Sequence, residues 1–130
     1  MSEFKFGPNQ EKWLQELESG NNLQCKKSLT RFDSDCRHYC CLGLAADKVL
    51  KLKRVDESDS TSYFIFNKYR LFAYLSGESY YELGLFSPQG DIMMNGEMKT
   101  LSQMNDSGLT FKEIAQFIRN NPEKVFSHSV

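Results

Sequence analysis

The segment CRHYCCLGLAADKVLKL, residues 36–52, contains three of the four cysteines, one of the two histidines and the longest apolar pattern with helical spacing. Leu42, Ala45, Ala46 and Val49 occupy positions i, i+3, i+4 and i+7, so they share one stripe of an α-helix. The glycine and alanines of this segment allow a neighbouring backbone to come close. We therefore predict a buried central helix over residues 41–53.

The N-terminal end of this predicted helix is a candidate ligand-facing corner. It combines a cation, an imidazole and an aromatic ring where the free N–H groups of a first helical turn point outward. A hairpin over residues 23–40 adds further cations to the same corner. The alternative is a solvated edge strand whose lysines oppose aggregation. The residues of this predicted cationic cluster are Lys26, Lys27, Arg31, Arg37 and His38, with Tyr39 beside them.

The composition predicts a single globular domain over residues 1–130. The chain is 40% hydrophobic and 13% aromatic, which is enough for a core and argues against disorder. Its formal net charge of −1 excludes generic nucleic-acid binding, which depends on a basic surface. Every apolar run is far shorter than the roughly 18 residues of a membrane-spanning helix, so no membrane partner is expected.

The N-terminal residues lack the basic start and the apolar stretch of a secretory signal peptide. We therefore expect a cytoplasmic protein. In that reducing compartment the four cysteines are expected to remain thiols.

The order of apolar patterns and turn signals predicts an α+β domain, with one small, mostly antiparallel sheet covered by about four helices. Thr110 and Glu113 form a capping box before an apolar helical stripe, and Thr100 can cap the short helix before it. Residues 69–75 fit a strand, with a helix over residues 68–75 as the alternative. Predicted strands lie within residues 23–40, 62–75 and 91–94, and predicted helices span residues 9–19, 41–53, 100–106 and 110–120.

Four pieces of the chain form an ordered pattern. They are a Trp helix at 13–20, an aromatic-Cys-Cys-Leu-Gly box at 39–43, Leu-Gly-Leu at 83–85, and Asn-Asp-x-Gly-x-Thr-Phe-x-Glu-Ile-Ala at 105–115. This pattern resembles that of a widespread, uncharacterised family of small bacteriophage and prophage proteins. Residues 55–73 are longer and more aromatic than the family pattern. The resemblance implies a phage origin and supplies no activity and no catalytic residue.

The cysteines allow two chemical interpretations besides a role in the core. Cys36, His38 and Cys40 would share one face of a strand, but a second cysteine pair, which a structural zinc site requires, is missing from the sequence. Cys40 could act as a nucleophile only with His38 as base and Asp106 as the orienting group, in an open cleft. Small buried core thiols are the commoner outcome. We predict no metal and no cofactor.

Asn105-Asp106-Ser107-Gly108 is a tight polar turn that can hold a ligand hydroxyl or simply cap two helices. Tyr39, Tyr80 and Tyr81 are aromatic rings that can stack on a nucleobase. The predicted ligand-binding residues are therefore the cationic cluster with Tyr39, Tyr80, Tyr81, Asn105 and Asp106.

We predict a phage-encoded, non-enzymatic binding protein that counters host defence by sequestering a small anionic, nucleotide-derived signalling molecule. The basis is one local cationic cluster in a nearly neutral protein, aromatic rings able to stack on a base, and the phage resemblance. A direct inhibitor that docks the aromatic segment 63–74 on a host defence protein is one alternative, and a cysteine-dependent hydrolase is another. A homo-oligomer is compatible with the sequence.

Overall fold

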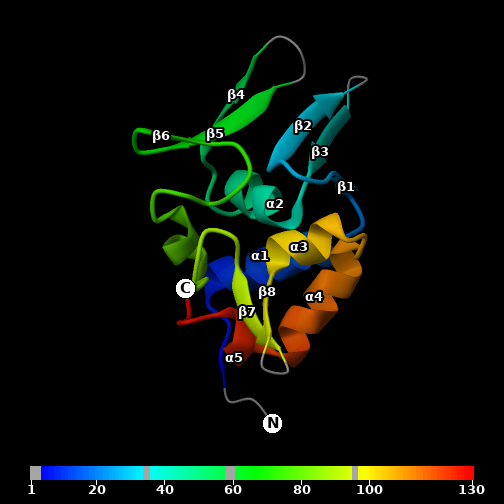
Figure 1. Cartoon of the computed structure of the whole chain (residues 1–130), viewed down its shortest axis with the longest axis vertical. Helices are drawn as coiled ribbons and strands as arrows, with labels where there is room; N and C mark the ends of the chain where they lie inside the picture. Colours follow the sequence, from blue (N-terminus) through cyan, green and yellow to red (C-terminus); the bar gives the residue numbers. More distant parts are fainter. Residues whose placement is uncertain (1–3, 34–35, 58–60, 95–96) are drawn as a thin grey trace.

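The computed structural model describes residues 4–33, 36–57, 61–94 and 97–130 (Figure 1). Helix α2 (Cys41–Lys48) lies near the middle of the molecule, with strand-rich segments on one side and most of the other helices on the opposite side. Within the described ranges, no helix is long and apolar enough to cross a membrane. The predicted α+β fold class is confirmed.

Helix α2 forms the centre of the core, as its apolar stripe predicts. Leu42, Ala45 and Ala46 are fully buried. The helix ends at Lys48, earlier than the predicted residue 53. The backbone of Lys51 lies in the left-handed region (φ 53°), which cannot continue a right-handed helix. The chain then enters a strand that the sequence pattern did not reveal, β4 (Lys53–Asp56).

Within the described ranges the strands form three small sheets, where the sequence predicted one. Their bounds are Leu23–Gln24 (β1), Thr30–Asp33 (β2), Cys36–Tyr39 (β3), Lys53–Asp56 (β4), Ser62–Phe66 (β5), Tyr69–Leu71 (β6), Asp91–Met94 (β7) and Glu97–Thr100 (β8). Strand β3 pairs in parallel with β1 and antiparallel with β2. Strand β5 lies between β4 and β6 and is antiparallel to both. Strands β7 and β8 form an antiparallel pair.

Strand β6 ends at Leu71, so the predicted strand over residues 69–75 is only partly correct, and the alternative helix over residues 68–75 is wrong. The segment after β6 is irregular because its hydrogen bonds go elsewhere. The carbonyl of Phe72 accepts a hydrogen bond from the N–H of Leu29 (2.7 Å), and the N–H of Leu75 donates to Pro88 (3.0 Å). The first bond holds Phe72 beside the chain that enters β2, and the second holds Leu75 beside Pro88.

The helices follow local capping signals. The Thr110 hydroxyl accepts a hydrogen bond from the N–H of Glu113, as the predicted capping box requires. Thr100 caps α3, as predicted, by accepting a hydrogen bond from the N–H of Gln103, and Gln103 completes a second capping box there. Besides α2, the helices are α1 (Pro8–Glu18), α3 (Leu101–Asp106), α4 (Phe111–Asn120), α5 (Pro122–Val125) and the 3₁₀ helix η1 (Ser79–Leu83).

Helix α1 begins slightly earlier than predicted, with Gly7 instead of Asn9 as its N-cap. The reason is a contact between distant parts of the chain. The carbonyl of Val130 accepts hydrogen bonds from the N–H groups of Asn9 (2.9 Å) and Gln10 (3.2 Å). A β-carbon at Gly7 would lie 2.2 Å from the backbone of Val130, so this approach requires glycine.

Helices α1 and α4 are joined by an ion-pair cluster. Arg119 of α4 donates to Glu18 (2.6 Å) and to Glu11 (2.9 Å) of α1. The hydrogen bonds that Arg119 donates to Glu18 and Glu11 raise the pKa of Arg119. The hydrogen bond from Arg119 outweighs burial and lowers the pKa of Glu11. Beneath the cluster, the only tryptophan, Trp13, is fully buried, which agrees with its predicted role in the core.

Candidate functional site

The aromatic-Cys-Cys-Leu-Gly box builds the N-terminal end of α2. Cys40 is the N-cap, and its Sγ accepts a hydrogen bond from the N–H of Gly43 (3.3 Å). The N–H of Cys40 donates to the carbonyl of Leu29 (3.1 Å). A β-carbon at Gly43 would lie 1.7 Å from that same carbonyl oxygen. The box therefore fixes the chain before β2 directly against α2.

Asn105 links three segments beneath this junction. Its Oδ1 accepts hydrogen bonds from the N–H of Cys41 (3.1 Å) and from Nε2 of Gln24 (2.8 Å), and its Nδ2 donates to the carbonyl of Cys25 (2.8 Å). The side chain of Asn105 is fully buried. Asn105 therefore holds the ends of α2, α3 and β1 together and lies below the surface of the site.

Asp106 follows Asn105 and reaches the same loop from outside. Its Oδ1 accepts a hydrogen bond from the backbone N–H of Lys27 (2.9 Å). Lys27 has a left-handed backbone (φ 66°), which is uncommon and unfavourable for a residue other than glycine. Asp106 belongs to the turn that was predicted to bind a ligand or cap a helix. In the structure it positions Lys27 of the predicted cationic cluster.

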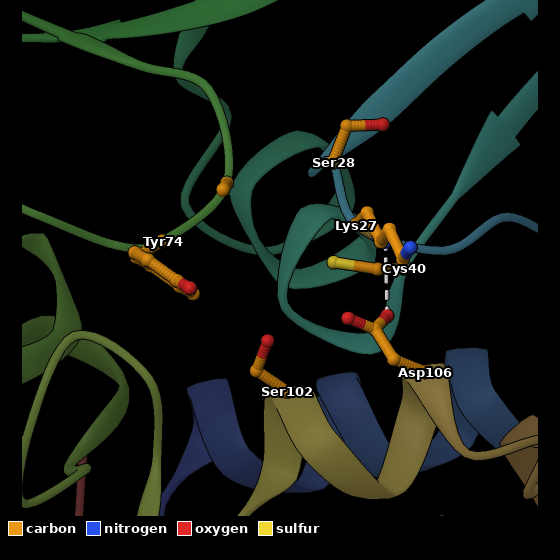
Figure 2. A pocket seen from close by; sticks show the side chains of 7 residues that line it. Lys27, Ser28, Cys40, Tyr74, Ser102 and Asp106 are labelled. Carbon is orange, nitrogen blue, oxygen red and sulfur yellow. Dashed lines mark hydrogen bonds between the residues drawn. The ribbon is translucent and has the colours of Figure 1, made fainter.

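Two adjacent hollows open on this side of the molecule and share Lys27 and Ser28. We call the first the α3 hollow; its volume is about 270 Å³. The second, the cationic hollow, has a volume of about 230 Å³. Lys27, Ser28, Cys40, Ala73, Tyr74, Ser102 and Asp106 line the α3 hollow (Figure 2), and Lys27, Ser28, Thr30, Arg31, Thr61, Ser62 and Phe72 line the cationic hollow.

The cationic hollow has two exposed cations in its wall, Lys27 and Arg31. In the described part of the chain neither side chain forms an ion pair. The described lining contains lysine, arginine, hydroxyl groups and an aromatic ring, and no carboxylate. This combination is suited to an anionic group, because a cation and several hydroxyl donors can contact it together.

Arg37 lies behind the cationic hollow. Its guanidinium donates to the hydroxyls of Thr30 (3.2 Å) and Ser62 (3.1 Å), both of which line the hollow, and it pairs with Asp56 at 2.7 Å. Partial burial acts to raise the pKa of Asp56, but hydrogen bonds from Ser62 and Arg37 outweigh burial and hold this pKa below its ordinary value. Arg37 is therefore largely committed to an internal ion pair and orients two hydroxyls of the lining.

The other residues of the predicted cluster lie outside both linings. Lys26 is exposed, and His38 lies on β3 opposite Arg31 of β2. Tyr39 is buried, and its hydroxyl donates to Asp47. Burial and this hydrogen bond raise the pKa of Tyr39. Its ring is therefore not free to stack on a ligand.

Tyr80 and Tyr81 belong to η1, away from the two hollows. Tyr80 packs against the core, and the exposed ring of Tyr81 lies 4.2 Å from that of His128. The structure does not bring these rings to Lys27 or Arg31. The aromatic side chains that do line the hollows are Phe72 and Tyr74.

Phe72 and Tyr74 were not among the predicted ligand-binding residues. Their side chains are 47% and 40% exposed, while Leu71 and Leu75 on either side of them are buried. This alternation is visible in the sequence and would have indicated two outward-facing aromatic rings. The predicted strands within residues 62–75 include Phe72 and Tyr74 but did not place them beside Lys27, because that contact depends on the hydrogen bond between Leu29 and Phe72.

The cysteines give no support to nucleophilic catalysis. Burial raises the pKa of the Cys40 thiol to about 12, and it raises the pKa of Cys41 well above its ordinary value. A thiol that stays protonated at neutral pH is a poor nucleophile. Among the described residues, no group of three or more histidine, cysteine, aspartate or glutamate side chains is placed to hold a metal ion.

Comparison with known proteins identifies a family and no characterised relative. No curated protein and no solved structure shows significant similarity to the chain. A family profile described as "Domain of unknown function (DUF8296)" matches residues 8–122. The matched region includes the box at α2, Asn105 and every described lining residue of both hollows. The chain therefore belongs to the DUF8296 family.

Proposed function

We propose that this protein is a phage-encoded binding protein that sequesters a small anionic, nucleotide-derived molecule and so counters a host defence signal. The observation that carries the proposal is the cationic hollow. Two exposed cations and several hydroxyls converge there without a carboxylate in the described lining, next to the exposed ring of Phe72. The whole chain has a net charge of −1, so this local gathering of cations is not a consequence of a basic composition.

The size and chemistry of the two hollows agree with a nucleotide. Each hollow is smaller than a usual small-molecule site of roughly 300–1,000 Å³, and together they fall within that range. Phosphate is bound most strongly by charge-assisted hydrogen bonds, which Lys27 and Arg31 can donate. Exposed aromatic rings such as Phe72 and Tyr74 can stack on a base.

The lining of the α3 hollow is consistent with sequestration without catalysis. The one thiol in the lining, Cys40, caps α2 and is 4% exposed. A protein that binds a messenger tightly and does not transform it acts by lowering its free concentration. The resemblance to phage and prophage proteins supports a host signal as the target.

Lys27 offers a test that separates binding from folding. Replacing Lys27 by glycine removes the ammonium group and keeps the N–H that donates to Asp106. Glycine adopts a positive φ without strain, so the melting temperature should stay unchanged or rise by a few degrees. Nucleotide affinity should fall about ten- to a hundredfold, the usual effect of losing a charge-assisted contact. Calorimetric titration with a panel of nucleoside phosphates and cyclic nucleotides measures the loss.

The matched control is Lys51→Gly. Lys51 is also an exposed lysine with a positive φ, 53°, and it lies outside both linings. This variant should show the same change in melting temperature and full nucleotide affinity. Equal affinity of the Lys27→Gly and Lys51→Gly proteins would refute a role of the cationic hollow in binding.

A direct inhibitor of a host defence protein is the second candidate, and one observation favours it. Tyr69, Phe72 and Tyr74 are 40–49% exposed, and all three belong to the aromatic segment predicted for docking. Exposed aromatic rings are common at the centres of protein interfaces. Under this alternative, Phe72→Ser abolishes binding of a host protein, and Lys27→Gly leaves that binding intact.

A further inference from the structure

The two hollows differ in charge. The α3 hollow contains the carboxylate of Asp106, whereas the described lining of the cationic hollow contains Lys27 and Arg31 and no carboxylate. A phosphate group is repelled by a carboxylate and attracted by the cations. An anionic ligand that spans both hollows must therefore place its phosphate in the cationic hollow and a hydrogen-bond-donating part in the α3 hollow.

The oxygen atoms of the α3 hollow are positioned as acceptors for such donors. One carboxylate oxygen of Asp106, Oδ1, accepts hydrogen bonds from Lys27 and Asn105. Within the described part of the chain the other oxygen has no hydrogen bond, and Figure 2 shows it directed into the space bordered by Tyr74 and Ser102. The hydroxyls of Tyr74 and Ser102 point into the same space.

We propose that the α3 hollow binds the vicinal 2′- and 3′-hydroxyls of a ribose, with Asp106 as the acceptor, while the phosphate of the same molecule lies in the cationic hollow. This inference rests on the proposed function, to which it adds the direction of the ligand and a requirement for ribose. A carboxylate suits a sugar diol because its free oxygen can accept charge-assisted hydrogen bonds from hydroxyl groups.

The two hollows meet at residues that line both of them, so one ligand can occupy both hollows at once. Lys27 and Ser28 line both hollows, and the N–H of Lys27 is held by Asp106. A nucleotide carries its phosphate and its diol on different sides of the sugar ring. One ligand can therefore contact Arg31 in one hollow and Asp106 in the other, with its base beside Phe72 or Tyr74.

The test compares ribonucleotides with their 2′-deoxy and 3′-deoxy counterparts by calorimetric titration of the full chain. The wild-type protein is expected to bind the ribonucleotide about tenfold more tightly than either deoxy form, the usual effect of a hydrogen bond to a charged group. In Asp106→Asn, the side-chain oxygen can still accept from Lys27, so the loop should keep its place. The preference for ribose over the deoxy forms should then fall to within about twofold.

Ser102→Ala provides a second variant. Alanine keeps the hydrogen bond from the backbone N–H of residue 102 to the carbonyl of Gln89 (3.2 Å). Within the described part of the chain, the hydroxyl of Ser102 has no hydrogen bond and points into the α3 hollow. The variant should fold normally and reduce the ribose preference without affecting the affinity for 2′-deoxynucleotides. Equal binding of ribo- and deoxynucleotides by the wild-type protein, with the Lys27→Gly loss intact, overturns this inference alone. Absence of binding to every nucleotide in the panel overturns the proposed function with it.

Discussion

Replacing Gly43 by alanine is expected to destabilise the protein by more than about 4 kcal/mol, which is exceptional for a single substitution. The added β-carbon would lie 1.7 Å from the carbonyl oxygen and 2.4 Å from the carbonyl carbon of Leu29. Both atoms are backbone, so no side-chain movement relieves the overlap. Separating the two segments breaks the hydrogen bond from Cys40 to Leu29 and displaces the N-terminal end of α2.

Gly108→Ala is the control for this prediction. Gly108 has a positive φ, 110°, but a β-carbon there would meet no atom within 4 Å. Its cost is limited to backbone strain, about 1–2 kcal/mol. Unfolding in urea measures both variants. A Gly43→Ala protein as stable as Gly108→Ala would show that the chain before β2 does not pack on α2 as described.

Replacing Asn105 by alanine has the second-largest expected effect, about 3–5 kcal/mol. The substitution leaves the N–H of Cys41 and the carbonyl of Cys25 buried without their partner, and it removes the acceptor of Gln24. Each buried group that loses its hydrogen bond costs about 1–3 kcal/mol. Because these groups join α2, α3 and β1, unfolding should remain cooperative at a lower urea concentration.

Asn120→Ala tests whether this cost comes from burial. Asn120 is exposed on α4, and its side-chain oxygen accepts a hydrogen bond from Gln116 (3.3 Å) on the same helix. The expected change is within about 0.5 kcal/mol. A similar small change for Asn105→Ala would contradict the role of Asn105 as the link beneath the site.

The parts of the fold that were predicted well are those whose signals lie among residues close together in the sequence. The capping boxes at Thr100 and Thr110 and the stripe of the helix after Thr110 can be recognised within a few residues, and all are present in the structure. The end of α2 was harder to predict, because its apolar pattern continues past Lys48 into β4. Three sheets in place of one follow from long-range pairing, which local patterns do not contain.

The candidate site was also predicted in part: local signals were recognised, and long-range contacts were not. Lys27, Arg31 and Asp106 were predicted from charge and turn chemistry, and the structure places all three in the walls of the hollows. The aromatic residues of those walls are Phe72 and Tyr74, which lie more than 30 positions after Lys27 and Arg31 in the sequence. They meet Lys27 through tertiary contacts. Sequence proximity to the cations instead favoured Tyr39. In the structure its hydroxyl donates to Asp47 and its ring is buried.

The double role of the Asn105–Asp106 turn could not be resolved from the sequence. A ligand contact and a helix cap were both compatible with its residue types. In the structure Asn105 is buried and links segments, whereas Asp106 lies at the edge of the α3 hollow with one oxygen directed into it. Two adjacent residues of one motif thus have different environments, which only the fold determines.

Mass spectrometry of the small molecules released by the purified protein tests the central claim most directly. The wild-type protein, Arg31→Ala and Lys124→Ala are isolated from phage-infected cells and denatured. Lys124 is an exposed cation on α5, outside both linings, so the two variants change the net charge equally. The wild-type protein and Lys124→Ala should release a nucleotide-derived anion in near-stoichiometric amount, and Arg31→Ala about tenfold less. Release of no phosphate-bearing molecule by any of the three, with a host protein co-purifying in equal amount, would contradict sequestration.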